Sequence, residues 1–253
     1  MSKTIQISVD WLANLLPDGW PIKSSTLITG PGGSGKPLIG NAIIDAWLKE
    51  GGGVVLMSLQ YPEKHFLYES FQRVVGYDLS SYEDQIVFVK FDPEAQRVGK
   101  AKRQSFSSNL VYPEHWDQTL DQASEILNRQ KESPGILLFA SALNLLFFSP
   151  TYRSSILDSI IKAMRDSRFC TLFAASSKPH ADLVNRIASQ ADNLIYTDKP
   201  GKEMSLYLKI ERMKEVRFND NRIHIPIPTS ELEATKDIAE HSRKRVIPEV
   251  SKI

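Results

Sequence analysis

The segment GPGGSGKP, which begins at Gly30, constrains this chain more than any other feature. Its spacing, Gly30-x-x-x-x-Gly35-Lys36, is that of a phosphate-binding loop, in which backbone N–H groups and a lysine surround phosphate oxygens. A strand-like run, 26–29, precedes the loop and a helical pattern follows it, as such a loop requires. The next position should carry a Ser or Thr hydroxyl for Mg²⁺, but this chain has Pro37. The segment therefore predicts a phosphate-binding loop with an altered metal position.

The remaining sequence alternates strand-like and helix-like segments, which predicts βαβ units and a mostly parallel sheet. Strands are expected at 26–29, 54–59, 86–91, 136–139 and 171–175, and helices at 38–50, 63–75, 116–131 and 153–165. Shorter runs at 194–196, 206–213 and 222–227 predict antiparallel strands along one edge. We expect one three-layer α/β/α domain over residues 1–228 and a charged helix with a loose tail over residues 229–253.

Composition excludes several classes of protein. A net charge of +1 gives no overall nucleic-acid or membrane signature. The single cysteine, Cys170, lies in an apolar run and is interpreted as a small core residue, so we expect a reducing cytoplasm and no disulfide. The longest apolar run, 136–148, is shorter than the about 20 residues of a membrane-spanning helix. No metal is expected, because the histidines lack ligand spacing: His65, His115, His180, His224 and His241.

Three segments carry a family resemblance. They are VDWLANLLPDGWPIKSSTLITGPGGSGK from Val9, VVLMSLQYPE from Val54 and LKIERMKEVRF from Leu208. In this order they resemble the beginning, the second strand and the basic strand of KaiC-like domains of the RecA superfamily. The resemblance extends from about Val9 to Ile227. It implies a RecA-like fold, ATP as a ligand, and assembly with copies of itself or with other RecA-fold subunits.

The resemblance also implies metal-binding positions, and this chain departs from them. Pro37 replaces the hydroxyl residue and removes a backbone N–H, although proline is accepted in the first turn of a helix. In ILLFASALNLL, Ala140 stands where the family has a metal-holding Asp. The neighbouring Ser141 is an alternative ligand, but its hydroxyl lacks the negative charge that hard cations favour.

The residues expected to handle the attacking water differ as well. Where the family has two glutamates after the second strand, this chain has Gln60 and Tyr61. Glutamine can orient a water molecule but is a poor proton acceptor, and Glu63 matches a position that usually begins the next helix. Loss of the metal alone lowers a phosphoryl-transfer rate by several powers of ten. We therefore interpret Pro37, Ala140 and Gln60–Tyr61 together as a loss of hydrolysis, with no catalytic residue assigned.

The sequence thus favours a non-catalytic RecA/KaiC-like protein that acts as an interaction or scaffold subunit. Its loop either binds phosphate or only connects strand to helix. Phosphate binding would use Gly30, Gly32, Gly33, Ser34, Gly35 and Lys36, with ATP or ADP held weakly and without Mg²⁺. The alternative is an active KaiC-like ATPase in which Ser141 or Gln60 replaces the expected groups.

A basic strand near the C-terminus has two interpretations. Arg212 and Lys214, with Arg217 further on, lie near the position of family residues that reach a neighbouring subunit's γ-phosphate. They are therefore candidates for an intersubunit contact. The alternative, which we favour, is a solvated strand face, because charged side chains usually face water.

A basic segment, 97–103, precedes Phe106 and Asn109. Lysine and arginine with an interleaved aromatic suit a nucleic-acid backbone, and the weaker alternative for the whole chain is a DNA-binding recombinase paralogue. A surface loop is the favoured interpretation. The connections at 148–153 and 177–180, through which recombinase relatives bind DNA, are short.

Overall fold

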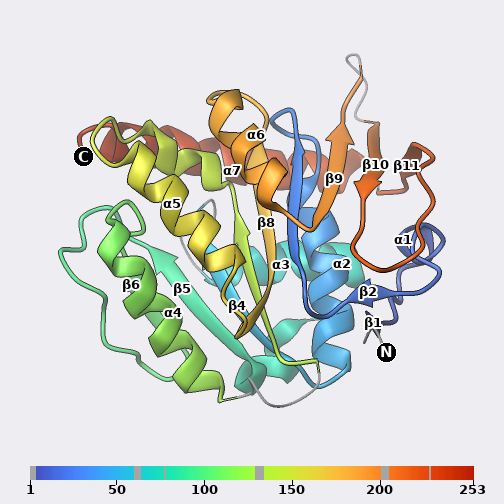
Figure 1. Cartoon of the computed structure of the whole chain (residues 1–253), viewed down its shortest axis with the longest axis horizontal. Helices are drawn as coiled ribbons and strands as arrows, with labels where there is room; N and C mark the ends of the chain where they lie inside the picture. Colours follow the sequence, from blue (N-terminus) through green and yellow to red (C-terminus); the bar gives the residue numbers. More distant parts are fainter. Residues whose placement is uncertain (1–3, 60–63, 77, 129–133, 201–204, 228) are drawn as a thin grey trace.

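A nine-stranded sheet with the strand order β11-β10-β9-β3-β8-β7-β4-β5-β6 forms the centre of the molecule (Figure 1). The structure, a computed structural model, describes residues 4–253 except 60–63, 77, 129–133, 201–204 and 228. The strands are β3 (Ser25–Gly30), β4 (Gly53–Ser58), β5 (Ile86–Phe91), β6 (Ser105–Ser108), β7 (Ile136–Ser141), β8 (Phe169–Ser176), β9 (Asn193–Asp198), β10 (Leu206–Arg212) and β11 (Ile223–Ile225). A separate antiparallel pair joins β1 (Thr4–Ile5) to β2 (Trp20–Pro21).

Seven neighbouring strands, from β9 to β6, are parallel, and β10 and β11 are antiparallel additions at one edge. The continuous apolar runs in β4 and β7 follow from this arrangement, because a parallel sheet is covered on both faces. The sequence predicts an antiparallel edge strand at 194–196, but β9 lies inside the sheet, parallel to β3 on one side and antiparallel to β10 on the other. A helix, α6, connects β8 to β9, and such a crossover returns the chain in the same direction.

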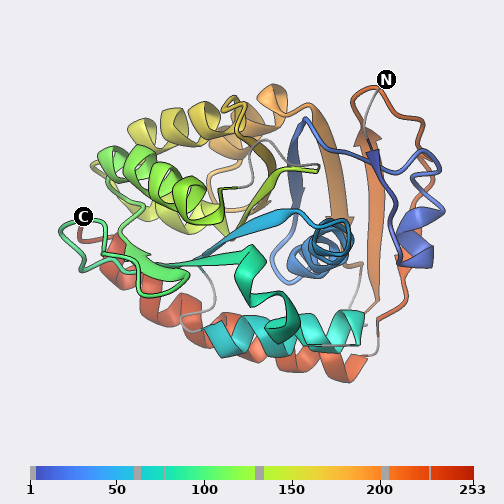
Figure 2. The ribbon, with the colours of Figure 1, turned by 90° about the horizontal axis from the view of Figure 1, so that it is seen from below.

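Helices cover both faces of this sheet. They are α1 (Asp10–Ala13), α2 (Lys36–Lys49), α3 (Lys64–Val75), α4 (Pro113–Leu127), α5 (Arg153–Met164), α6 (Ala181–Gln190) and α7 (Thr229–Val250), with short 3-10 helices η1 (Leu79–Gln85) and η2 (Leu143–Phe148). Figure 2 shows α4, α5 and α6 on one side of the sheet and α2, α3 and α7 on the other. The expected three-layer α/β/α architecture is therefore confirmed.

Alternating side chains of the strands divide the core into two apolar layers. Leu27, Val55 and Leu138 pack toward α4, α5 and α6. Their neighbours, which include Ile28 and Leu137, pack toward α2 and α3. Cys170 is buried in this second layer, and burial raises the pKa of its thiol to about 11. A protonated, enclosed thiol is what the interpretation of Cys170 as a small core residue requires.

The expected C-terminal helix is present as α7, which lies along the edge of the sheet where the parallel strands end (Figure 1). Its end is not loose, contrary to expectation. Val246 and Val250 belong to the apolar core, and Val250 is fully buried. Two valines four residues apart lie on one helix face, and their burial holds this end of α7 against the domain.

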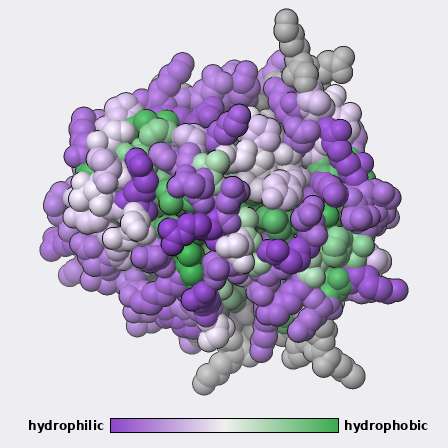
Figure 3. Space-filling model, turned by 45° about the horizontal axis from the view of Figure 1, so that its top comes forward, coloured by the Kyte–Doolittle hydropathy of each residue, from purple (hydrophilic) through white to green (hydrophobic). Residues whose placement is uncertain are grey.

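The surface is mainly hydrophilic on the face that Figure 3 shows, where apolar patches are small and separate. Among the described residues, Tyr196 is the one large hydrophobic residue whose side chain is exposed. Within the same described part of the chain, no helix combines the length and the apolar character needed to cross a bilayer.

We predict that Gly40→Ala destabilises the fold. Gly40 lies in α2, and a Cβ there would be 2.4 Å from the Phe139 ring. Overpacking of this kind costs about 1–3 kcal/mol, which exceeds the about 1 kcal/mol that alanine gains over glycine in a helix. Urea unfolding measures the change, and Phe139→Leu in the same chain should restore part of the loss. A Gly40→Ala variant more stable than the parent would contradict this packing.

Candidate phosphate-binding site

The loop between β3 and α2 has a conformation that two of its glycines make possible. Gly30 has φ of 144°, and a Cβ on it would lie 2.1 Å from the Thr197 carbonyl oxygen of β9. Gly35 has φ of 72°, the left-handed region, and directly precedes α2. Any larger residue at Gly30 would displace β9, and a β-carbon at Gly35 would strain the turn. The glycine pattern is therefore explained by the close approach of β9 and by the turn into α2.

Lys36 is the charged centre of this loop, although its side chain is only 6% exposed. The Nζ atom donates to Pro31 O at 2.7 Å, to Gly30 O at 3.1 Å and to Ser34 Oγ at 3.2 Å. The ammonium group thus folds back onto its own loop. Burial, with the nearby positive charge of Arg243, lowers the pKa of Lys36 to about 7. An anion beside Lys36 would oppose both effects.

Ser34 ties the loop to the sheet. Its hydroxyl donates to Pro31 O at 2.7 Å and lies 2.6 Å from Thr197 Oγ1. Pro37 stands in the first turn of α2 without disturbing the helix, as expected for proline there. The next N–H, that of Leu38, donates to Gly35 O at 2.9 Å. The loop and helix therefore form with Pro37 in place.

A cavity of about 90 Å³ opens between this loop, η2 and α7. Four cationic residues line it: Lys36, Lys199 after β9, and Lys236 and Arg243 from α7. Arg243 reaches the loop, because its Nη1 lies 3.6 Å from the place of a Cβ on Gly32. None of the described lining residues is Asp or Glu. The cavity therefore has the electrostatics of an anion site.

The residues that the structure describes do not fit a Mg²⁺ ion at this site. Hard cations bind carboxylates and other oxygen ligands, whereas the described lining of the cavity holds no carboxylate. Pro37 has no hydroxyl, and the Ser34 hydroxyl is engaged with Pro31 and Thr197. Nowhere in the described part of the chain do three or more His, Cys, Asp or Glu residues gather as potential metal ligands. The same lining residues carry positive charge that a phosphate chain would complement.

Comparison with known proteins identifies the family. A family model described as "ATPase: KaiC" matches residues 5–237. This chain belongs to the KaiC family. A solved KaiC-like protein from the hyperthermophilic archaeon Pyrococcus horikoshii matches with a TM-score of 0.65 and 15% identity, over 90% of this chain and 95% of that one. At that identity the likeness concerns the fold alone, and no curated protein matches the chain.

The family match ends at residue 237, inside α7. Arg243 and the buried end of α7 therefore lie beyond the matched span. Sequence reasoning did not place Lys199, Lys236 or Arg243 at the site, because no local motif connects them to the loop. The last helix carries a short basic run, 243–245, but its composition as a whole is not basic and does not point to the loop.

The other positions predicted as altered lie apart from the cavity or outside the described residues. Ala140 is fully buried in the core layer that faces α4, α5 and α6, and it does not line the cavity. Ser141 ends β7 and is buried as well. Gln60, Tyr61 and Glu63 fall outside the residues that the structure describes. The family roles inferred for these positions stay predictions.

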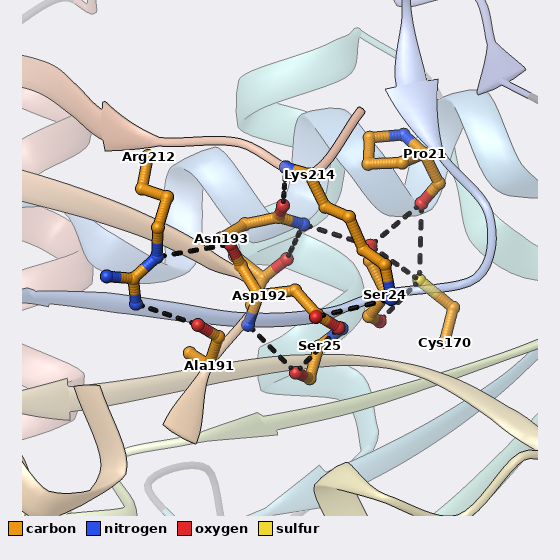
Figure 4. A network of polar contacts seen from close by, with 10 residues as sticks. Pro21, Ser24, Ser25, Cys170, Ala191, Asp192, Asn193, Arg212 and Lys214 are labelled. Atoms are coloured by element: carbon orange, nitrogen blue, oxygen red, sulfur yellow. Dashed lines mark hydrogen bonds and ion pairs between the residues drawn. The ribbon is translucent and has the colours of Figure 1, made fainter. Parts of the chain in front are cut away.

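Arg212 and Lys214 of this KaiC-family chain contact their own domain (Figure 4). Arg212 Nη2 donates to Ala188 O at 2.8 Å and to Ala191 O at 2.7 Å, the carbonyls at the end of α6. Lys214 Nζ lies 3.3 Å from Asp192 Oδ1. These contacts favour a structural role, and an intersubunit contact stays a prediction.

The basic segment 97–103 is exposed at its four cations: Arg97, Lys100, Lys102 and Arg103. Phe106, however, is only 4% exposed and belongs to the core. Asn109 is also buried, and its Nδ2 donates to Pro93 O at 2.8 Å. The aromatic side chain that base stacking needs is thus turned inward, which favours the surface-loop interpretation.

We predict that Lys36 makes the stability of the protein depend on pH. Its pKa is about 7 in the folded chain and near the ordinary value of 10.5 when unfolded. Between these two pKa values, Lys36 is protonated more often in the unfolded chain than in the folded one. The free energy of unfolding of the parent, compared with that of Lys36→Met, should therefore rise as pH increases from about 7 toward 10. Urea unfolding between pH 6 and 9.5 measures this difference. Lys100→Met, at an exposed lysine of the 97–103 segment, is the control, and parallel curves for parent and Lys36→Met would contradict the prediction.

We also predict that Arg212→Gln lowers stability by about 1–3 kcal/mol, because two carbonyl groups at the end of α6 lose a charged donor. Thermal and urea unfolding of the single variant measure the loss. Arg222→Gln, at an exposed ion pair with Asp198, is the matched control and should cost about 0–1 kcal/mol. Equal, small effects of both substitutions would argue against a stabilising contact between Arg212 and α6.

Proposed function

We propose that this KaiC-family protein is a non-catalytic subunit that binds the phosphate chain of ATP or ADP without Mg²⁺. The observation that carries the proposal is the charge of the cavity at the loop. Four cations line it, and no carboxylate does so among the described lining residues. P-loop sites that hold Mg²⁺ beside phosphate add a hydroxyl and a carboxylate to their cations.

Electrostatics supports metal-free binding. A triphosphate carries several negative charges, which family members offset partly with Mg²⁺. Here Lys36, Lys236 and Arg243 come from two separate elements and converge on the loop. Charge-assisted hydrogen bonds from such groups are about twice as strong as neutral ones. Side chains thus supply charge that a metal would otherwise supply.

The same features argue against turnover. Phosphoryl transfer depends on a metal and on a group that orients water. Pro37 cannot provide the first, and the buried Ser141 is absent from the cavity lining. A protein that binds nucleotide and does not hydrolyse it fits the role of an interaction or scaffold subunit. Its partners in this proposal are copies of itself or other RecA-fold subunits, in the cytoplasm.

Calorimetry with ATP, ADP and AMP tests the binding half of the proposal. We expect ATP and ADP to bind in EDTA at least as tightly as in Mg²⁺, because the proposed site uses no metal ligand and Mg²⁺ in solution competes for the same phosphate oxygens. Lys36→Ala should weaken binding about tenfold or more, since it removes a buried charged donor. Lys49→Ala, an exposed lysine at the far end of α2, is the control and should bind like the parent.

Hydrolysis of labelled ATP with Mg²⁺ tests the other half, and we expect no turnover above background. Mg²⁺-dependent turnover that Lys36→Ala abolishes would establish the active-ATPase alternative instead. Absence of binding under every condition would mean that the loop only connects β3 to α2.

A further inference from the structure

The last helix approaches the loop from the opposite end of the chain. α7 is anchored by Val246 and Val250 in the core layer that also holds Leu145 and Phe147 of η2. η2 itself follows β7 and lines the cavity through Asn144 and Leu145. The anchor therefore fixes the C-terminal half of α7 beside the loop.

The spacing of residues along α7 directs its cations to the cavity. Arg243 precedes Val246 by three residues, and Lys236 precedes Arg243 by seven, so all three share one helix face. Arg243 forms no ion pair with any carboxylate among the described residues, whereas Lys236 Nζ lies 3.8 Å from Glu240 Oε1. Arg243 is thus the stronger candidate for an added anion.

We propose that α7 is a cationic lid, which places Arg243, with Lys236 beside it, on a phosphate chain held by the loop of the same molecule. This inference rests on the proposed function. It adds that Arg243 and Lys236 replace the metal and that α7 is the helix that carries them. The ligand chemistry is that of a di- or triphosphate, whether free or attached to a nucleoside.

The charge of the cavity supports a lid. Its described lining joins loop residues 32–36 to Lys236 and Arg243 of α7 and contains no carboxylate, so the phosphate end of a nucleotide would lie between the loop and α7. Lys36 and Arg243 repel each other, and an anion between them turns this repulsion into two attractions.

Calorimetry in EDTA with ATP, tripolyphosphate and AMP tests the lid on the full chain. Arg243→Gln should weaken binding of ATP and tripolyphosphate about tenfold or more and that of AMP less, because charged hydrogen bonds to the terminal groups are lost. Lys236→Gln should have a smaller effect. The exposed neighbour Lys244→Gln is the matched control and should bind like the parent. If ATP and tripolyphosphate lose affinity by the same factor, Arg243 acts on the phosphate chain that the two compounds share. If only ATP loses affinity, Arg243 acts on the nucleoside, and the inference is overturned.

Hydrogen exchange of the unmodified protein gives a second readout. ATP should slow exchange in α7 as well as in the loop, and protection of the loop alone would count against a lid. If Arg243→Gln fails to fold, Arg243→Lys and this exchange measurement decide the question.

The two proposals fail in different ways. Binding that is lost in Lys36→Ala but unchanged in Arg243→Gln overturns the lid and leaves the proposed function intact. Tighter binding by Arg243→Gln would mean that α7 blocks the site. A parent protein that binds none of the three compounds overturns both proposals.

Discussion

The hydrogen bonds from Lys36 to its own loop determine the state of the whole site. The ammonium group is enclosed, and the carbonyl oxygens of Gly30 and Pro31 are its main acceptors. Neutral carbonyls compensate only part of the cost of burying a charge, which is why the pKa of Lys36 falls to about 7. The loop is consequently held in shape by a charge that lacks a counter-ion among its hydrogen-bond partners. In the proposed function a phosphate group would supply the negative charge that these carbonyls lack.

The parallel sheet explains why distant segments meet at this lysine. Carboxyl ends of parallel strands share one edge, so the loop after β3, the end of β9 and the η2 segment after β7 lie together. Thr197 of β9 contacts Ser34, and α7 crosses the same edge. The strand order therefore brings these segments together, and the loop motif lines only one side of the cavity.

Elements with strong local patterns were predictable from sequence, and elements that depend on tertiary context were not. The apolar runs of β4, β5 and β7 and the loop motif indicated the sheet and its class. The prediction missed β6, because SFSS has little apolar character, and it missed α6 although Leu183, Val184, Ile187 and Ala188 recur at helical spacing. Sequence indicated Lys36 but not Arg243, which has no motif and reaches the loop only through the burial of Val246 and Val250.

Two features of the site are complementary in charge. Pro37 stands where a hydroxyl would help to hold a divalent cation, and α7 brings Lys236 and Arg243 to the same cavity. Two monovalent side chains carry the same total charge as one Mg²⁺, but they are fixed to the protein and do not exchange with solvent. In the proposed function a metal-free site of this kind would hold phosphate, yet it would have no ion to bridge attacking and leaving oxygens. A charged loop and an absence of hydrolysis are therefore compatible in this proposal.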